Sequence, residues 1–345
     1  MNAYKIAENT IKKRKLASFN DFFILMVSGG SDSTALAYIM KEFAETRMAI
    51  VHINHNLRKN AIKDQQFVEN LAKHLDIKCI VYSKDIKKIS KENNQNIEAC
   101  GHDIRYKCAN NAVKIISELK NISKSKIKIC SAHTADDRIE NFYMRSIVGT
   151  GPGGLASIQY KNQNIIRPLL DLSKDELRDY IKSLDNPYIY ENNQLWREDE
   201  TNLNTERFRA YVRHNIIPLA KKQNPNMINN LCNSMNLIAD ESEYLEKEVC
   251  KILDNYFVFG EDNFLIKPQF KELDLVLKRR AIYNALIEIF KPGTRIETKS
   301  INSILQATEQ NNYTDNIQEN FSVHSNKLGT LVQTMKAYRI SRNRL

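Results

Sequence analysis

One short segment, residues 27–34, carries most of the side chains that could bind a ligand, and it reads Val-Ser-Gly-Gly-Ser-Asp-Ser-Thr. Adjacent glycines let the backbone turn tightly and approach a ligand closely, and the serines add hydroxyl donors. A helix that begins near Asp32 would point its free N–H groups at the same place, which predicts an anion site, although a simple glycine turn with a polar helix cap has the same composition. The contacts of the predicted anion site are Ser28, Gly29, Gly30, Ser31, Asp32 and Ser33.

Asp32 is an awkward residue for an anion site, because its carboxylate repels phosphate unless a divalent cation bridges the two. A second acidic segment, His133-Thr134-Ala135-Asp136-Asp137, follows another apolar run. Two adjacent acids at a helix start can cap the helix, and they can equally ligate Mg²⁺. We therefore predict that an acid of this segment holds Mg²⁺ together with Asp32, and that His133 hydrogen-bonds a phosphate or shuttles a proton.

The glycine loop differs from three common motifs of nucleotide-binding proteins and hydrolases. It lacks the lysine and the spacing of a Walker A loop, and it does not match the G-x-G-x-x-G dinucleotide fingerprint or the G-x-S-x-G of serine hydrolases. The six cysteines form no C-x-x-C pair, which argues against a zinc ribbon, an iron–sulfur cluster or a redox pair. We expect reduced thiols in a cytoplasmic protein.

Short apolar runs separated by amphipathic helical patterns must position these side chains. The predicted strands are 22–27, 48–53, 78–82, 127–132 and 165–167, and they are rich in Ile, Val or Phe. Their alternation with helices predicts an α/β fold, a doubly wound and mostly parallel sheet with helices on both faces. Ligands of such sheets bind at the carboxyl ends of the strands, where both acidic segments lie.

The length of the chain limits the number of domains, and its net charge indicates the class of binding partner. We predict a ligand-binding catalytic domain over 1–217 and a mainly helical C-terminal region over 218–345, with 308–320 as loop. Lys and Arg number 51 against 41 Asp and Glu, and this net charge of +10 favours a polyanionic partner, nucleic acid first, although it can also serve solubility alone. The longest early apolar run, 22–27, is far shorter than the ~20 residues of a membrane-spanning helix, so no membrane association is expected.

The glycine loop resembles S-G-G-x-D-S, the PP-loop of the ATP pyrophosphatase superfamily, in which it holds the pyrophosphate of ATP. Further segments are similar to those of one family within it, the tRNA(Ile)-lysidine synthetases. In 132–145 the family pattern is A-H-x-x-D-D-Q-x-E-T-x-x-M-R, and Arg138 and Asn141 replace its Gln and Thr here. The other matching segments are 52–58, 96–106, 149–155, 167–170, 199–202 and 209–218.

The resemblance implies roles for several arginines. Arg105 would act in the catalytic site with Asp32, His133 and Asp137, because its segment is like the family's N-I-E-A-x-x-R-x-x-R-Y helix. Arg209 and Arg213 lie one helical turn apart and would grip RNA phosphates, or else simply solvate their helix. A C-terminal RNA-contacting module would include Arg279 and Arg280.

The resemblance also implies a reaction with ATP and Mg²⁺ as cofactors, in which Asp32 and Asp137 hold the Mg²⁺. The C2 carbonyl oxygen of the wobble cytidine, in tRNA(Ile) with a CAU anticodon, would attack the α-phosphate of ATP. The ε-amine of free L-lysine would then displace AMP and give lysidine. Alternatives are a PP-loop tRNA thiolase, a small-molecule ligase such as an NAD synthetase, and a basic RNA-binding module without activity. The oligomeric state stays open, with a homodimer as one option.

Overall fold

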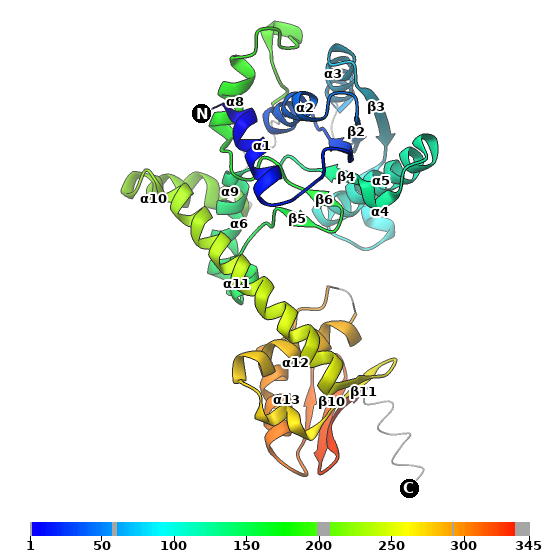
Figure 1. Ribbon diagram of the computed structural model, residues 1–345, viewed down its shortest axis with the longest axis vertical. Helices are drawn as coiled ribbons and strands as arrows, with labels where there is room; N and C mark the ends of the chain where they lie inside the picture. The colour runs from blue at the N-terminus through cyan, green and yellow to red at the C-terminus, as the bar shows by residue number, and fades with distance from the viewer. Residues whose placement is uncertain (1, 57–60, 199–207, 292, 335–345) are drawn as a thin grey trace. The chain divides into compact units, whose positions relative to one another are not determined.

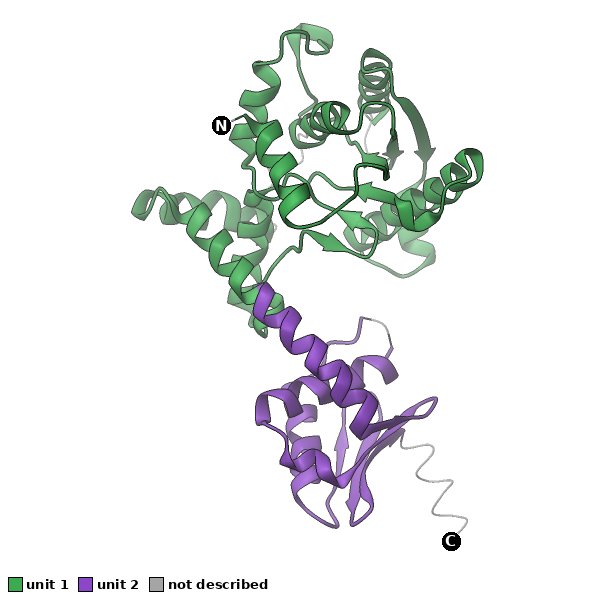
Figure 2. Cartoon of the chain, in the orientation of Figure 1, with its two compact units in different colours: residues 1–238 green, residues 239–345 purple. Residues whose placement is uncertain are grey.

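A computed structural model describes residues 2–56, 61–198, 208–291 and 293–334 of the chain (Figure 1). They form two compact units, 1–238 and 239–345, coloured separately in Figure 2. The predicted boundary at 217/218 lies inside unit 1. The division falls later because Met227 and Met235, which follow that boundary, share a buried core with Ala135 and Ile139.

Unit 1 is built on a six-stranded sheet, and this confirms the predicted α/β fold. The strand order is β3-β2-β1-β4-β6-β5, and every pair is parallel except β5 with β6. The strands are β1 (Phe22–Met26), β2 (Met48–Asn54), β3 (Lys78–Ser83), β4 (Ile127–Cys130), β5 (Lys161–Asn162) and β6 (Ile165–Ile166).

The sheet is buried on both faces, as its continuous apolar strands require. Successive side chains of a strand point to opposite faces, so Phe23 and Leu25 of β1 enter one core while Phe22 and Ile24 enter another. Helices cover both faces of the sheet (Figure 1). One core is lined by α1 (Ala3–Lys13), α2 (Ser31–Ala44), α3 (Ala61–His74) and α8 (Lys174–Lys182), and the other by α5 (Ile97–Lys120), against which α4 (Ile86–Glu92) packs.

The remaining elements of unit 1 follow β4 and the sheet edge. Helix α6 leaves β4, and a π-helix turn, Val212–Ile216, packs near it. The last helix, α11, starts in unit 1 and ends in unit 2. The bounds are α6 (Ala135–Val148), α7 (Pro152–Leu155), α9 (Phe208–Tyr211), α10 (Ile217–Gln223) and α11 (Met227–Tyr256), with 3₁₀ turns at Lys124–Lys126 and Glu191–Asn193.

Unit 2 contains helices, as expected, and also a five-stranded antiparallel sheet that the sequence analysis missed. Its order is β7-β8-β11-β10-β9, and α12 and α13 contribute to the same core. Strand β9 (Thr314–Ile317) lies in the stretch predicted as loop. That prediction was wrong for this strand because Asp315 and Asn316 are residues that strands usually lack. The other elements are β7 (Phe257–Phe259), β8 (Asn263–Ile266), the 3₁₀ turn Pro268–Glu272, α12 (Leu275–Ile289), α13 (Thr298–Glu309), β10 (Phe321–Asn326) and β11 (Gly329–Thr334).

In the part of the chain described here, no helix combines the length and the apolar character needed to cross a membrane.

Candidate active site

The candidate site lies where β1 and β4 end side by side. These strands are parallel neighbours, with Leu25 beside Cys130 in register. From β1 the chain continues to β2 and β3 toward one edge of the sheet, whereas β4 and β6 lie between β1 and the other edge. The direction in which strands are added therefore reverses between β1 and β4. Side chains that follow both strands meet at this reversal, which is where ligands bind in sheets of this kind. The glycine loop follows β1, and the segment of His133 and Asp137 follows β4.

The glycine loop has the tight turn that the sequence predicted. Gly29 has a φ of +97°, which side chains other than glycine rarely adopt. A Cβ at Gly29 would also lie 3.4 Å from Phe67 Cδ1, so the backbone is packed closely against α3. Gly30 is the N-cap of α2 and has no side chain to cap it, which leaves N–H groups at the helix start for a ligand.

Ser33 organises the loop from inside. Its Oγ accepts hydrogen bonds from the N–H groups of Ser28 and Gly29, both at 3.2 Å, and donates to the carbonyl of Gly30 at 3.0 Å. Ser33 is buried, whereas Ser28 is exposed. Among the predicted anion contacts, the hydroxyl of Ser28 is therefore open to a ligand, and the hydroxyl of Ser33 holds the turn in shape.

Arg197, from a later segment of the chain, contacts the glycine loop and was not anticipated. The N–H of Arg197 donates to the carbonyl of Gly29 at 2.8 Å. The Arg197 guanidinium donates from Nε to Asp64 Oδ1 at 3.0 Å, and both side chains are largely buried. Arg197 thus ties the loop after β1 to α3.

Asp137 is held in place by the start of α6. Thr134 and Asp137 form a capping box: the Thr134 N–H donates to Asp137 Oδ2 at 2.9 Å, and the Asp137 N–H donates to Thr134 Oγ1 at 3.3 Å. The other oxygen, Oδ1, faces Lys174 Nζ at 3.3 Å and Arg209 Nη2 at 2.9 Å. Burial raises the pKa of Asp137, but the charges of Lys174 and Arg209 outweigh it and lower that pKa to about 2.

One ammonium group lies against both predicted magnesium ligands. Lys174 Nζ is 4.0 Å from Asp32 Oδ2 and 3.3 Å from Asp137 Oδ1, so the two carboxylates face the same point. Burial raises the pKa of Asp32 and the charge of Asp137 adds to that rise, while Lys174 opposes it. Two neighbouring carboxylates make it more costly for each to stay ionised, and a shared cation offsets that cost.

The residues present fit Mg²⁺ only as a partial set of ligands. No group of three or more His, Cys, Asp or Glu side chains in the described residues could hold a metal ion. Mg²⁺ commonly takes one or two carboxylates and fills its octahedron with water and substrate phosphates. Asp32 and Asp137 match that pattern, with the glycine loop as the adjoining phosphate site.

His133 is a neutral imidazole at physiological pH. Burial lowers its pKa to about 4, and Arg167, Arg209 and Arg105 contribute in the same direction against Asp137. Its Nδ1 lies 2.5 Å from Ser131 Oγ, which fixes the ring beside the end of β4. A neutral His133 can donate or accept one hydrogen bond at Nε2, depending on the tautomer.

His55, from one of the segments that match the family pattern, is a second histidine whose pKa is influenced by Arg105. Burial lowers the pKa of His55 to about 4, and the charge of Arg105 adds to that effect. Arg105 itself is exposed on α5. The charge of Arg105 acts on both His55 and His133, and its catalytic role stays a prediction.

The two arginines predicted to grip RNA are engaged inside the protein. Arg213 donates to both oxygens of Glu140, from Nε at 2.5 Å and from Nη2 at 3.0 Å. Arg209 bridges Glu140, from Nε at 2.7 Å, and Asp137, from Nη2 at 2.9 Å. The Glu140 side chain is only 1% exposed. Burial would raise the pKa of Glu140, but the bond from Arg213 and the nearby positive charges lower it.

Arg209 and Arg213 therefore have carboxylate partners within the protein that the sequence did not reveal. A contact between RNA and the exposed part of these side chains stays a prediction. Arg213 lies in the π-helix turn, a feature often found at functional sites. Glu140 was missed, although it lies one turn after Asp137 on the same helix face. Lys174 and Arg197 were missed because they are 37 and 60 residues beyond Asp137 with no local pattern that points to it.

In unit 2, Arg279 and Arg280 differ from one another. Arg280 donates from Nε to Glu246 Oε1 at 2.6 Å and also to Ser242, so it joins α12 to α11. Arg279 is exposed. Of the two, Arg279 is therefore the more open to a partner.

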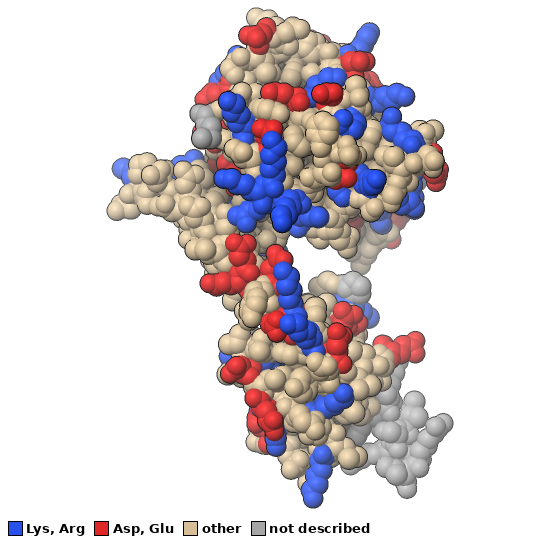
Figure 3. Space-filling view, in the orientation of Figure 1, with Lys and Arg blue, Asp and Glu red and all other residues tan. Residues whose placement is uncertain are grey.

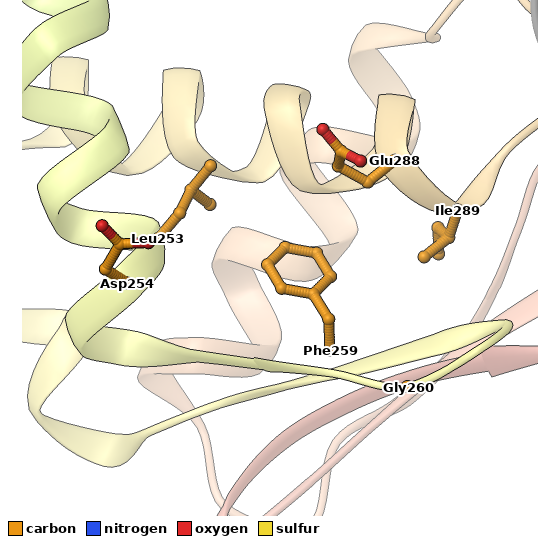
Figure 4. A pocket seen from close by; sticks show the side chains of 6 residues that line it. All are labelled: Leu253, Asp254, Phe259, Gly260, Glu288 and Ile289. Atoms are coloured by element: carbon orange, nitrogen blue, oxygen red, sulfur yellow. The ribbon is translucent and has the colours of Figure 1, made fainter.

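A hollow on unit 2 is lined by none of these residues. Figure 4 shows the ring of Phe259 at its floor, with Leu253 and Asp254 from α11 on one side and Glu288 and Ile289 from α12 on the other. It contains no residue that the sequence assigned to chemistry.

Similar proteins agree with the motifs. A family model for the PP-loop domain matches residues 3–220. A protein of Clostridium perfringens named tRNA(Ile)-lysidine synthase is 34% identical over 302 residues, which cover 86% of this chain and 61% of that protein. A protein of the same name from Persephonella marina is 30% identical over 89% of this chain and 64% of its own length. The chain thus spans about three fifths of the length of these relatives.

A solved structure shares the fold. The U34-tRNA thiolase NcsA of Methanococcus maripaludis superposes with a TM-score of 0.50 at 16% identity, covering 68% of this chain and 79% of that one. At that identity the likeness concerns the fold alone. The PP-loop match covers well over half of the chain and includes both strand ends of the site, and the chain therefore belongs to the PP-loop domain family.

Proposed function

We propose that this protein is an ATP-dependent ligase that modifies tRNA(Ile) with a CAU anticodon by joining L-lysine to C2 of the wobble cytidine. The proposal rests mainly on the positions of Asp32 and Asp137. These residues follow neighbouring strands, and both carboxylates face the Lys174 ammonium beside the glycine loop. The names of the relatives support tRNA as the substrate.

In the first step, the cytidine C2 oxygen attacks the α-phosphate of ATP, and the bond to the β-phosphate breaks as pyrophosphate leaves. Ser28, Ser31 and the N–H groups at the start of α2 would bind the pyrophosphate. Mg²⁺, held by Asp32 and Asp137, would supply charge neutralisation for the phosphates. His133 is neutral and can hydrogen-bond the reacting phosphate without adding charge.

In the second step, the ε-amine of lysine attacks C2, and the C2–O bond breaks as AMP leaves. The amine must lose a proton to become a nucleophile. Asp137 remains ionised because Lys174 and Arg209 lower its pKa. Its carboxylate can therefore orient the incoming ammonium, while His133 can accept a proton. Arg105 would stabilise charge on the phosphate.

The basic surface fits an RNA partner. On the face drawn in Figure 3, Lys and Arg side chains gather over the end of α1. Lys12, Lys13, Arg14 and Lys15 are all exposed there. We expect the affinity for tRNA to fall with salt, with a log–log slope of about 0.7–0.9 per phosphate contacted. A flat salt dependence would remove the argument from charge.

The two cysteines in the strands of the unit 1 sheet, Cys79 and Cys130, are poorly suited to sulfur chemistry. Burial raises the pKa of Cys79 to about 12 and also raises the pKa of Cys130, so neither is a thiolate at physiological pH. A thiolase activity is therefore the weaker candidate.

The experiment is a three-part incubation of the full chain with ATP, [¹⁴C]lysine and tRNA transcripts. Label that enters tRNA(Ile) with a CAU anticodon, but not methionine tRNA with the same anticodon, supports the proposal. Production of AMP without RNA would point to a small-molecule ligase. Absence of both label and AMP, while tRNA still binds, would leave a binding module.

A further inference from the structure

Lys174 occupies a position that its own helix disfavours. It is the first residue of α8, after the N-cap Ser173, and a positive charge there opposes the helix dipole. Its N–H donates to Asp136 Oδ2 at 2.8 Å, which fixes the start of α8 against α6. Its ammonium extends to Asp32 and Asp137, and the side chain is 22% exposed. The carboxylates, rather than the helix, therefore hold the ammonium.

The ammonium and a divalent cation cannot occupy this point together. Both would approach the same two carboxylates, and at contact distance their charges repel strongly in a partly buried site. The lysine stem has four flexible carbons, so its ammonium can move by several ångströms without backbone motion.

We infer that Lys174 is an exchangeable counter-ion: its ammonium balances Asp32 and Asp137 in the nucleotide-free protein, is displaced by the divalent cation, and then turns to the phosphates of ATP. This inference rests on the proposed function for the nucleotide, and not on the identity of the RNA. Lys174 is thereby a metal-gating and phosphate-binding residue, and it keeps the two carboxylates from repelling one another before substrate arrives.

The first test is binding of Mn²⁺ alone, measured by the electron paramagnetic resonance signal of free Mn²⁺. Lys174→Gln removes the competing charge, so Mn²⁺ should bind about tenfold tighter or more than to the wild-type protein. Lys174→Arg keeps the charge and should not show that gain.

Lys221→Gln is the matched control. Lys221 Nζ lies 3.9 Å from Asp136 Oδ1, so it also neighbours an acid at the start of α6. Its removal changes the net charge equally, and it should leave Mn²⁺ affinity within about twofold of wild type. Equal gains for both glutamine variants, or no gain for Lys174→Gln with unchanged circular dichroism and Tm, would overturn the inference.

The second test follows Lys174 itself by acetic anhydride labelling and peptide mass spectrometry. The exchange predicts slow labelling in metal-free protein, faster labelling with Mg²⁺ alone, and slow labelling again with Mg²⁺ and ATP. Labelling that does not change with Mg²⁺ would refute displacement. Tighter Mn²⁺ binding in Lys174→Gln with no ATP binding to any variant would support the exchange and refute the proposed nucleotide chemistry.

Discussion

Replacement of Glu140 by glutamine tests whether the ion-pair network of α6 holds the site together. Glu140 is almost completely buried and accepts three hydrogen bonds from Arg209 and Arg213. Gln has the same shape, but it loses the charge and turns an amide N–H₂ toward a guanidinium. Removal of one partner of a buried pair costs about 3–5 kcal/mol. Because both arginines are partly exposed and can regain water, we expect the low end, ~3 kcal/mol.

The assay is thermal and urea unfolding of the full chain. For a unit of this size, 1 kcal/mol corresponds to about 2–4 °C, so Glu140→Gln should lower the Tm of unit 1 by roughly 6–12 °C. Glu8→Gln is the control, since the Glu8–Lys12 pair is equally short, at 2.6 Å, but lies on the exposed side of α1. It should cost no more than about 0.5 kcal/mol.

A loss below about 1 kcal/mol for Glu140→Gln would refute the reasoning, because it would mean that the arginines do not depend on the carboxylate. A double-mutant cycle with Arg213→Gln separates the pair from general packing. Strong coupling between the two substitutions is expected, and additive effects would contradict the contact geometry.

Three further outcomes follow from the site. Asp32→Asn should reduce ATP turnover by about a hundredfold or more with little change in Tm, since burial already disfavours its charged form; retained turnover in the ATP–[¹⁴C]lysine assay would remove its metal role. Arg197→Met should weaken ATP binding roughly tenfold while kcat changes little, because the loop loses its tie to α3, and Trp196, the only tryptophan of the chain, can report this by fluorescence. Because His133 and His55 have a pKa of about 4 when folded, below the ordinary 6.5, the unfolded chain binds more protons between these values. The contribution of these histidines to the free energy of unfolding should be fully present above about pH 6.5. It should fall as the pH drops toward 4, by up to ~1.4 kcal/mol per pH unit for each histidine. Urea unfolding of wild type and His133→Asn at several pH values should show a smaller slope for the variant.

Sequence alone was sufficient where the information is local. The turn at Gly29 needs positive φ and close approach, and adjacent glycines after an apolar strand express that directly. The strands of unit 1 are buried on both faces, so their sequences are unbroken apolar runs, and this pattern predicts a parallel sheet. That topology then brings Asp32 and Asp137 to the same edge, because neighbouring parallel strands end together.

The sheet of unit 2 could not be read in the same way. Its strands are short and half-exposed, and β9 carries Asp and Asn. Asp315 accepts a hydrogen bond from the Ser303 hydroxyl of α13, and that bond forms only in the folded unit. Antiparallel pairing supplies the backbone bonds that decide these residues' conformation, and the amino-acid pattern carries little of that information.

Charge pairing was decided by the tertiary structure alone. The sequence predicts Arg209 and Arg213 as solvent-facing RNA contacts. In the structure both bind Glu140, which lies 69 and 73 residues earlier in the chain. Lys174 reads as an ordinary first-turn lysine, and only the fold places it between two acids. Local sequence expresses backbone preference and burial, because these depend on neighbouring residues, whereas the partner of a long charged side chain depends on which distant segments the fold brings within 4 Å.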